Sequence, residues 1–235
     1  MKSSLGIKIR RILRELRGYQ PMNYKKSPIV LEGLVFFVPL AALSVVSYAF
    51  HNSWLGGFFS AAALFVLWFF RNPERKIPED VKSVLSPADG RVLKIEEVDG
   101  NDMLNGRYKK ISIFMSVFNV HVNRMPCSGR VKDIRYRKGK FFSANLDKAS
   151  ELNESNAVLV ETDDKKEILT IQIAGLIARR IVCWIEKGME AIQGERFGLI
   201  RFGSRLEVFL PLEAEVLVKR GERVKAGETR IGCFK

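Results

Sequence analysis

The longest apolar stretches of the sequence lie near its N-terminus. One runs from Ile29 to Phe50 and a second from Trp54 to Phe70, with a short polar break between them. At a rise of about 1.5 Å per residue, the first run is long enough to cross a hydrocarbon core of about 30 Å, whereas the second is short for a full crossing. The pattern therefore predicts a membrane-anchoring helical hairpin over residues 28–70.

Ahead of the hairpin, residues 1–27 mix apolar and basic positions at helical spacing. The apolar members recur at i, i+4, i+7, i+8 and i+11: Leu5, Ile9, Ile12, Leu13 and Leu16. This spacing, with basic residues in between, is typical of an amphipathic helix that lies on a membrane surface. A tail whose charges only flank the hairpin is the open alternative.

Basic residues stand on both sides of the hairpin. Lys25 and Lys26 precede it, and Arg71, Arg75 and Lys76 follow it. Because short segments rich in Lys and Arg stay on the cytoplasmic side, both outer ends are expected in the cytoplasm. The sequence thus predicts a protein of the cell (inner) membrane whose remaining chain lies on the cytoplasmic side.

Beyond residue 70 the pattern changes to short segments of β-forming residues separated by turn signals. Strands are expected over residues 91–95, 111–115, 129–134, 157–161, 168–173 and 181–185, with residues 117–122 as the exit of the second of these, and one short helix over residues 144–153. Many short strands with turns between them indicate a mostly β (α+β) fold. Residues 71–235 are therefore predicted to form a single β-rich domain, sandwich or barrel-like.

Composition adds charge to this picture. The 235 residues include 39 Lys and Arg against 26 Asp and Glu, a net charge of +13, which favours an anionic membrane or another polyanion as partner. Three cysteines without paired spacing argue against a disulfide framework. Two distant histidines argue against a structural zinc site, so no metal ion is expected.

The segment over residues 199–211 carries the first candidate for chemistry. It is rich in β-forming residues and ends at Pro211, which predicts one strand, but Gly203 and Ser204 interrupt it. One interpretation is a kink with a solvated serine. The other is that Ser204 Oγ attacks the carbonyl of Gly203 to form an ester. Elimination across Ser204 Cα–Cβ would then break the chain and leave a pyruvoyl group.

Such an attack needs a base. His121 is the only histidine outside the hairpin, and Asp89 lies in a Pro-Ala-Asp-Gly turn. Asp, His and Ser can form a triad from any order in the chain. The alternatives are a histidine satisfied by a backbone carbonyl and an aspartate that bonds its own backbone.

Five segments stand in order along the chain: FFRNPER (69–75), SPADGRV (86–92), NVHVNRMP (119–126), KASELNE (148–154) and GERFGLIRFGS (194–204). Together they resemble the short form of phosphatidylserine decarboxylase. The resemblance covers nearly everything from Phe69 to the C-terminus. It implies a proenzyme that cuts itself between Gly203 and Ser204. The products would be a β chain of residues 1–203 and an α chain of residues 204–235, whose first residue is the pyruvoyl cofactor formed from Ser204.

The resemblance also assigns Asp89, His121 and Ser204 as the charge-relay set for the cut. The long form of the family has two histidines three residues apart, whereas this chain has His121 followed by Arg124. Arginine does not lose its proton at accessible pH, so it cannot replace a general base. Either His121 serves both the cut and the later reaction, or another group starts the processing.

The expected reaction is the decarboxylation of phosphatidylserine to phosphatidylethanolamine and CO2, with the pyruvoyl ketone as electron acceptor and His121 as general acid. Four arginines are either headgroup contacts or solvated surface residues: Arg124, Arg179, Arg180 and Arg201. No nucleic-acid partner is expected, and a homo-oligomer stays open. The competing hypotheses are a decarboxylase of another serine lipid and an uncut, membrane-tethered β-sandwich adaptor.

Overall fold

A computed structural model describes residues 27–80, 82–143, 152–176, 180–201 and 203–234 of the chain. The chain divides into two compact units, Met1–Glu74 and Arg75–Lys235. Two predictions fall largely on residues outside the described ranges: the amphipathic segment over residues 1–27 and the short helix over residues 144–153.

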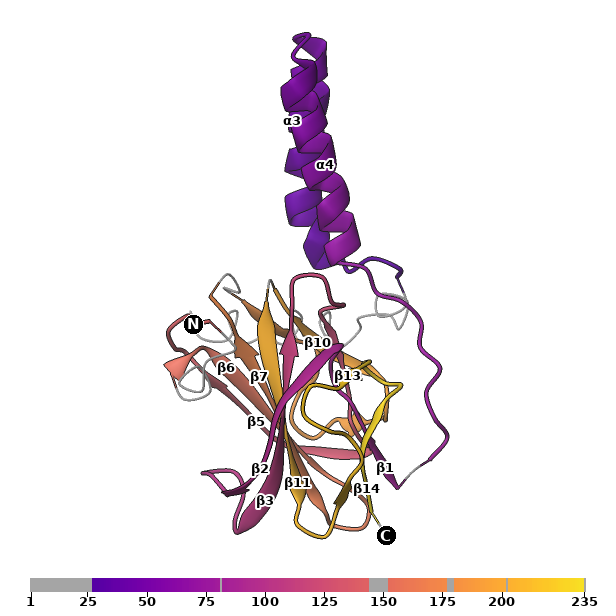
Figure 1. Ribbon diagram of the computed structural model, residues 1–235, viewed down its shortest axis with the longest axis vertical. Helices are drawn as coiled ribbons and strands as arrows, with labels where there is room; N and C mark the ends of the chain where they lie inside the picture. Colours follow the sequence, from indigo (N-terminus) through magenta and orange to yellow (C-terminus); the bar gives the residue numbers. More distant parts are fainter. Residues whose placement is uncertain (1–26, 81, 144–151, 177–179, 202, 235) are drawn as a thin grey trace, which may run out of the picture. The chain divides into compact units, whose positions relative to one another are not determined.

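The first unit is a helical hairpin (Figure 1). A 3-10 turn, η1 (Leu31–Gly33), leads into α3 (Leu34–Ala49), and α4 (Ser53–Phe69) returns beside it. Ser44 Oγ donates to the carbonyl of Gly56 at 3.1 Å, so small residues bring the two backbones close together. The predicted hairpin is confirmed as a pair of helices.

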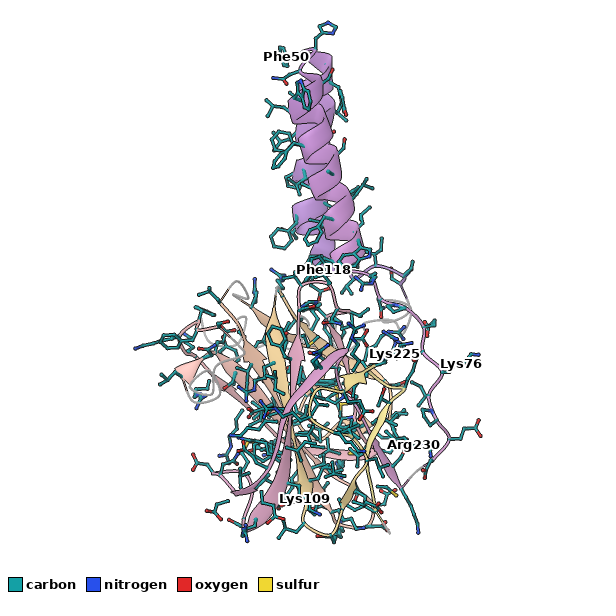
Figure 2. All side chains as sticks on the ribbon, viewed as in Figure 1. Phe50, Lys76, Lys109, Phe118, Lys225 and Arg230 are labelled. Carbon is teal, nitrogen blue, oxygen red and sulfur yellow. The ribbon has the colours of Figure 1, made fainter. Side chains whose placement is uncertain are left out.

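The outer surface of the hairpin is apolar. Large side chains point away from the helix pair along its whole length, and Phe50 projects from the tip with 81% of its surface exposed (Figure 2). The helix over Leu31–Ala49 is long and apolar enough to cross a membrane, and the helix over Ser53–Phe69 is shorter. An apolar surface of this extent marks a site of contact with a membrane or a partner protein.

The second unit is built from strands, which confirms the predicted mostly β fold. The first seven are β1 (Ser83–Leu85), β2 (Gly90–Asp99), β3 (Arg107–Met115), β4 (Val122–Arg124), β5 (Gly129–Arg137), β6 (Ser155–Glu161) and β7 (Glu167–Ala174). The next seven are β8 (Ile181–Cys183), β9 (Glu190–Ala191), β10 (Arg196–Ile200), β11 (Ser204–Pro211), β12 (Glu215–Val216), β13 (Arg223–Val224) and β14 (Arg230–Cys233).

These strands form three antiparallel sheets. A curled sheet has the order β13-β2-β3-β11-β7-β6-β5-β9, and two small sheets have the orders β4-β10-β8 and β1-β14-β12. β11 therefore lies inside the large sheet, between β3 and β7 (Figure 1). Because side chains alternate along a strand, Leu206 and Val208 enter the main core while Arg205 and Glu207 lie on the other face.

The prediction of one strand over residues 199–211 is wrong. β10 ends at Ile200 in a small sheet, and β11 begins at Ser204 in the large one. The chain changes sheet between these two residues, and Gly203 has φ +68° there. A run of β-forming residues predicts extended backbone but carries no signal of which sheet it joins. The Gly203–Ser204 peptide thus lies where the chain crosses from one sheet to another.

Candidate functional site

Ser204 is the first residue of β11, and its side chain is fully buried at 0% exposure. It is aligned with Met115 on β3 and with Ala174 on β7. Ser204 Oγ donates to the thioether sulfur of Met115 at 3.3 Å. A solvated serine is therefore ruled out, and the hydroxyl is held in the protein interior by a weak acceptor.

Gly203 adopts a backbone conformation that favours glycine. Its φ of +68° lies in the left-handed region, yet a Cβ built on it would meet only Val117 Cγ1, at 4.0 Å. The requirement for glycine is therefore conformational rather than steric. The backbone N–H of Gly203 donates to Nε2 of His121 at 3.3 Å.

His121 precedes β4 and is 2% exposed. Its Nδ1 lies 3.0 Å from the carbonyl oxygen of Asn119. A carbonyl only accepts, so Nδ1 carries the proton, and Nε2 is the nitrogen with the lone pair in the neutral ring. The contact from Gly203 N–H to Nε2 agrees with this tautomer. The basic nitrogen of His121 is thus directed at the backbone next to the Gly203–Ser204 bond.

Asp89 lies directly before β2, which is two strands from β11 and therefore about 10 Å from it. Both of its carboxylate oxygens accept from Arg75 Nη2, at 3.0 and 2.8 Å. Oδ1 also accepts from the backbone N–H of Ala226 at 2.8 Å. Among the described residues, Gly203, Ser204 and His121 are thus brought together, whereas the hydrogen bonds of Asp89 go to other partners.

Arg124 occupies the place of the second histidine of the long form. Its side chain is buried, and Nη1 donates to the carbonyl of Gly194 at 2.8 Å, so it supports the turn before β10. Of the other candidate headgroup arginines, Arg180 is exposed and Arg201 is half-buried, and Arg179 lies outside the described residues.

Two contributors to the site were not expected from the sequence. Asn119 orients His121 through its carbonyl, and its Oδ1 accepts from the N–H and the hydroxyl of Ser116, at 2.9 and 2.8 Å. A serine near an asparagine is a local turn signal that could have indicated this loop. Met115 has no such signal, because its contact with Ser204 depends on the register of two distant strands.

The opposite face of β11 carries a separate cavity of about 730 Å³. It is lined by charged residues that include Arg205 and Glu207, whose Nε and Oε1 atoms are 3.2 Å apart. Since successive side chains point to opposite faces, the side chain of Ser204 does not reach this cavity. In the described part of the chain, no group of three or more His, Cys, Asp or Glu residues is arranged to hold a metal ion.

Comparison with known proteins gives one consistent result. The family model described as phosphatidylserine decarboxylase matches residues 62–232. The phosphatidylserine decarboxylase proenzyme of Syntrophus aciditrophicus is 56% identical over 207 residues, which cover 88% of this chain and 97% of that protein. The proenzymes of Desulfotalea psychrophila and Geobacter metallireducens are 46% and 45% identical, covering 87% and 91% of this chain and 96% and 100% of their own.

Proposed function

Because this chain belongs to the phosphatidylserine decarboxylase family, we propose that it converts phosphatidylserine to phosphatidylethanolamine and CO2 after cutting its own backbone between Gly203 and Ser204. The chain is a decarboxylase, and its relatives are named proenzymes. One precursor would therefore supply both chains of the mature enzyme. The observation that supports the cut best is the basic nitrogen of the buried His121, which lies 3.3 Å from the backbone nitrogen of Gly203.

The cut begins with the hydroxyl of Ser204. Its oxygen adds to the carbonyl carbon of Gly203 while its proton passes to Nε2 of His121. The bond from that carbon to the nitrogen of Ser204 then breaks, and the nitrogen takes the proton back, which leaves an ester. In the precursor Ser204 Oγ donates to Met115, and the N–H of Gly203 occupies the lone pair of His121 Nε2. The hydroxyl must therefore turn from the sulfur and replace that N–H at Nε2 before its proton can move.

The second stage removes the ester. A base takes the α proton of Ser204, the Cβ–Oγ bond breaks, and Gly203 leaves with a carboxylate. The remaining unsaturated residue takes up water and loses ammonia, which gives the pyruvoyl group. That group is no larger than the serine it replaces, so the buried position of Ser204 accommodates it. Its ketone would supply the electron acceptor for loss of CO2 from the amino acid headgroup.

The remaining residues of the site have supporting roles in this proposal. His121 is held in one tautomer by Asn119, so its Nε2 can later carry a proton to the substrate carbon that has lost CO2. By resemblance Asp89 belongs to the charge relay. The geometry favours a structural role instead, because the Asp89 carboxylate accepts from the N–H of Ala226 and so connects the β chain to the α chain.

The helical hairpin would anchor this enzyme in the membrane that contains its substrate. The substrate is a membrane lipid, so a tethered enzyme meets it without extracting it from the bilayer. The basic residues at both ends of the hairpin favour the cytoplasmic side of the inner membrane, and the net charge of +13 favours an anionic leaflet.

The decisive experiment replaces Ser204 by alanine in the full chain, purified in detergent. The wild-type protein should yield fragments of residues 1–203 and 204–235, the smaller blocked at its N-terminus by a pyruvoyl group, and should release CO2 from phosphatidylserine. The S204A variant should stay intact and inactive. Ser83→Ala removes another buried hydroxyl, one that donates to Asp80, and should be cut and active. An uncut wild-type protein that releases CO2 would overturn the proposal.

The identity of the headgroup is tested separately. Vesicles that contain phosphatidylserine or another serine lipid would be compared at equal surface density, and phosphatidylserine should be the preferred substrate. A wild-type protein that is neither cut nor active on any serine lipid would favour the adaptor.

A further inference from the structure

We infer that Asn123 holds the base of self-cleavage, His121, and its nucleophile, Ser204, in the relative positions that the reaction needs. It does so through a buried row of side-chain amides that ends on Met115. This inference rests on the proposed self-cleavage. Asn123 is on β4, two residues after His121, and is fully buried.

The amide of Asn123 links the two strands that flank β11. Its Oδ1 accepts from Nε2 of Gln172 on β7 at 2.8 Å, and its Nδ2 donates to the sulfur of Met115 on β3 at 3.7 Å. Met115 is aligned with Ser204, and Gln172 is aligned with Leu206. One side chain from the small sheet therefore spans the start of β11, directly beside the residue that is to be modified.

The row continues away from the site. Nδ2 of Asn156 on β6 donates to Oε1 of Gln172 at 2.9 Å, so three amides in succession each donate toward Met115. Asn156 is 3% exposed and Gln172 is 0% exposed. A buried amide that loses its partner is costly, and aligned hydrogen bonds strengthen one another, so the row holds each amide in one orientation.

The row reaches both reacting groups. The sulfur of Met115 accepts from Asn123 Nδ2 and also from Ser204 Oγ, so the position of the sulfur sets the position of the hydroxyl. Asn123 also fixes β4 against the large sheet, and β4 carries His121 at its start. These contacts hold Nε2 of His121 beside Gly203, although His121 precedes a strand of the small sheet and Gly203 precedes a strand of the large one.

The chemistry of the surroundings supports a positioning role. Apolar residues such as Phe197 and Ile200 make up the adjoining core, where a leucine or valine would pack without any need for hydrogen bonds. A row of amides in such a place specifies one arrangement of the strands rather than adding apolar burial. Asn123 is accordingly a positioning residue that acts through His121 and Met115, not a catalytic one.

The test measures the first-order rate of the cut in full-length chains made by cell-free synthesis with detergent. Asn123→Leu should slow the cut by about ten- to a hundredfold, because displacements of about 1 Å in a reacting pair have effects of that size. Asn123→Asp keeps the shape and the acceptor for Gln172 but lacks the amide donor, and it should slow the cut less. Met115→Leu should slow it severalfold, whereas Met125→Leu, another buried methionine of the same core, should leave it unchanged.

A double variant separates positioning from a general loss of structure. If Asn123 acts through His121, then Asn123→Leu added to His121→Gln should slow the residual cut by less than twofold. That residual is followed by intact mass over days, with hydroxylamine to release any ester. Protection of the buried thiol of Cys127 from alkylation verifies the fold of each variant.

Three outcomes are distinguishable. An Asn123→Leu chain that cuts at the wild-type rate, or a double variant that is tenfold slower than His121→Gln alone, overturns the role of Asn123 and leaves the proposed function intact. Should Asn123→Leu fail to fold, the same comparison is made with Asn123→Asp, and a wild-type rate there has the same meaning. If the His121→Gln chain itself cuts normally, the assigned base is wrong, and the proposed mechanism fails with it.

Discussion

Replacing Gly203 by alanine tests whether the backbone conformation at the proposed cleavage site drives the cut. A non-glycine residue at φ +68° has an unfavourable conformational energy of about 1–2 kcal/mol. The added Cβ would have a single neighbour, Val117 Cγ1 at 4.0 Å, so no clash accompanies this strain. Strain of this kind persists only where the surroundings enforce it. The hydrogen bond from Gly203 N–H to His121 Nε2 is long, at 3.3 Å, and is expected to be too weak to enforce it. The alanine variant is therefore expected to relax to negative φ.

That relaxation would remove the reactive geometry. Rotation about φ changes where the carbonyl carbon of residue 203, which Ser204 Oγ attacks, lies relative to Nε2 of His121. The chain must then recover about 1–2 kcal/mol to return to the reactive geometry. Since about 1.4 kcal/mol corresponds to a tenfold change in rate, the cut should slow by about five- to thirtyfold.

Gly221 provides a matched control. It has φ +86° with nothing within 4 Å of its Cβ position, and its N–H donates to Val92 at 2.8 Å, which holds it in place. Gly221→Ala should therefore lower the stability of an uncut Ser204→Ala chain by about 1 kcal/mol in urea unfolding and leave the cutting rate of the normal chain unchanged. Both rates come from pulse-labelled precursor on denaturing gels. A Gly203→Ala chain that cuts within twofold of wild type would refute the reasoning.

Two further predictions follow from charged groups. Asp89→Asn keeps the shape of the side chain but removes its ion pair with Arg75, so urea unfolding should show a free energy of unfolding that is lower by about 1–3 kcal/mol. The cut should slow less than it does in His121→Gln. Equal slowing in the two variants would instead support a charge relay. Burial by itself raises the pKa of Glu96, but hydrogen bonds from two lysines outweigh it and hold that pKa below its ordinary value of 4.5. The stabilisation by Glu96 is therefore present above about pH 4.5 and is lost as the pH falls through the lowered pKa. Glu96→Gln should lower the free energy of unfolding by up to about 1 kcal/mol at about pH 7. This difference from the wild-type protein should shrink toward zero as the pH is lowered to about 2.

The parts of the fold that the sequence predicts are those with a local signal. Two apolar runs are enough to indicate the hairpin, and alternation identifies the longer strands of the second unit. Ser204 stands out because a glycine and a serine interrupt a run of β-forming residues, and His121 because histidine is scarce in this chain.

What the sequence does not predict depends on contacts between distant segments. The change of sheet between β10 and β11 leaves the pattern of residues 199–211 almost unaltered, apart from Gly203. The contact of Met115 with Ser204 follows from the pairing of β3 with β11, which no local pattern specifies. The turn around Asp89 is evident in the sequence, but its partner Arg75 precedes β1 and reaches it only in the folded domain.

If the chain is cut between Gly203 and Ser204 as proposed, the place of the cut would allow a buried serine to become an accessible cofactor. On its C-terminal side, Ser204 begins a strand that pairs with β3 over its whole length and with β7 as far as Phe209, and the Arg205–Glu207 ion pair lies on the opposite face. On its N-terminal side, Gly203 belongs to the short connection from the other sheet and lies outside both β10 and β11. Breaking the peptide therefore releases the connection beside position 204 but leaves position 204 itself in the sheet. Because the new chain end at Gly203 is not part of either strand, it can move away from the pyruvoyl group without displacing a strand of the large sheet.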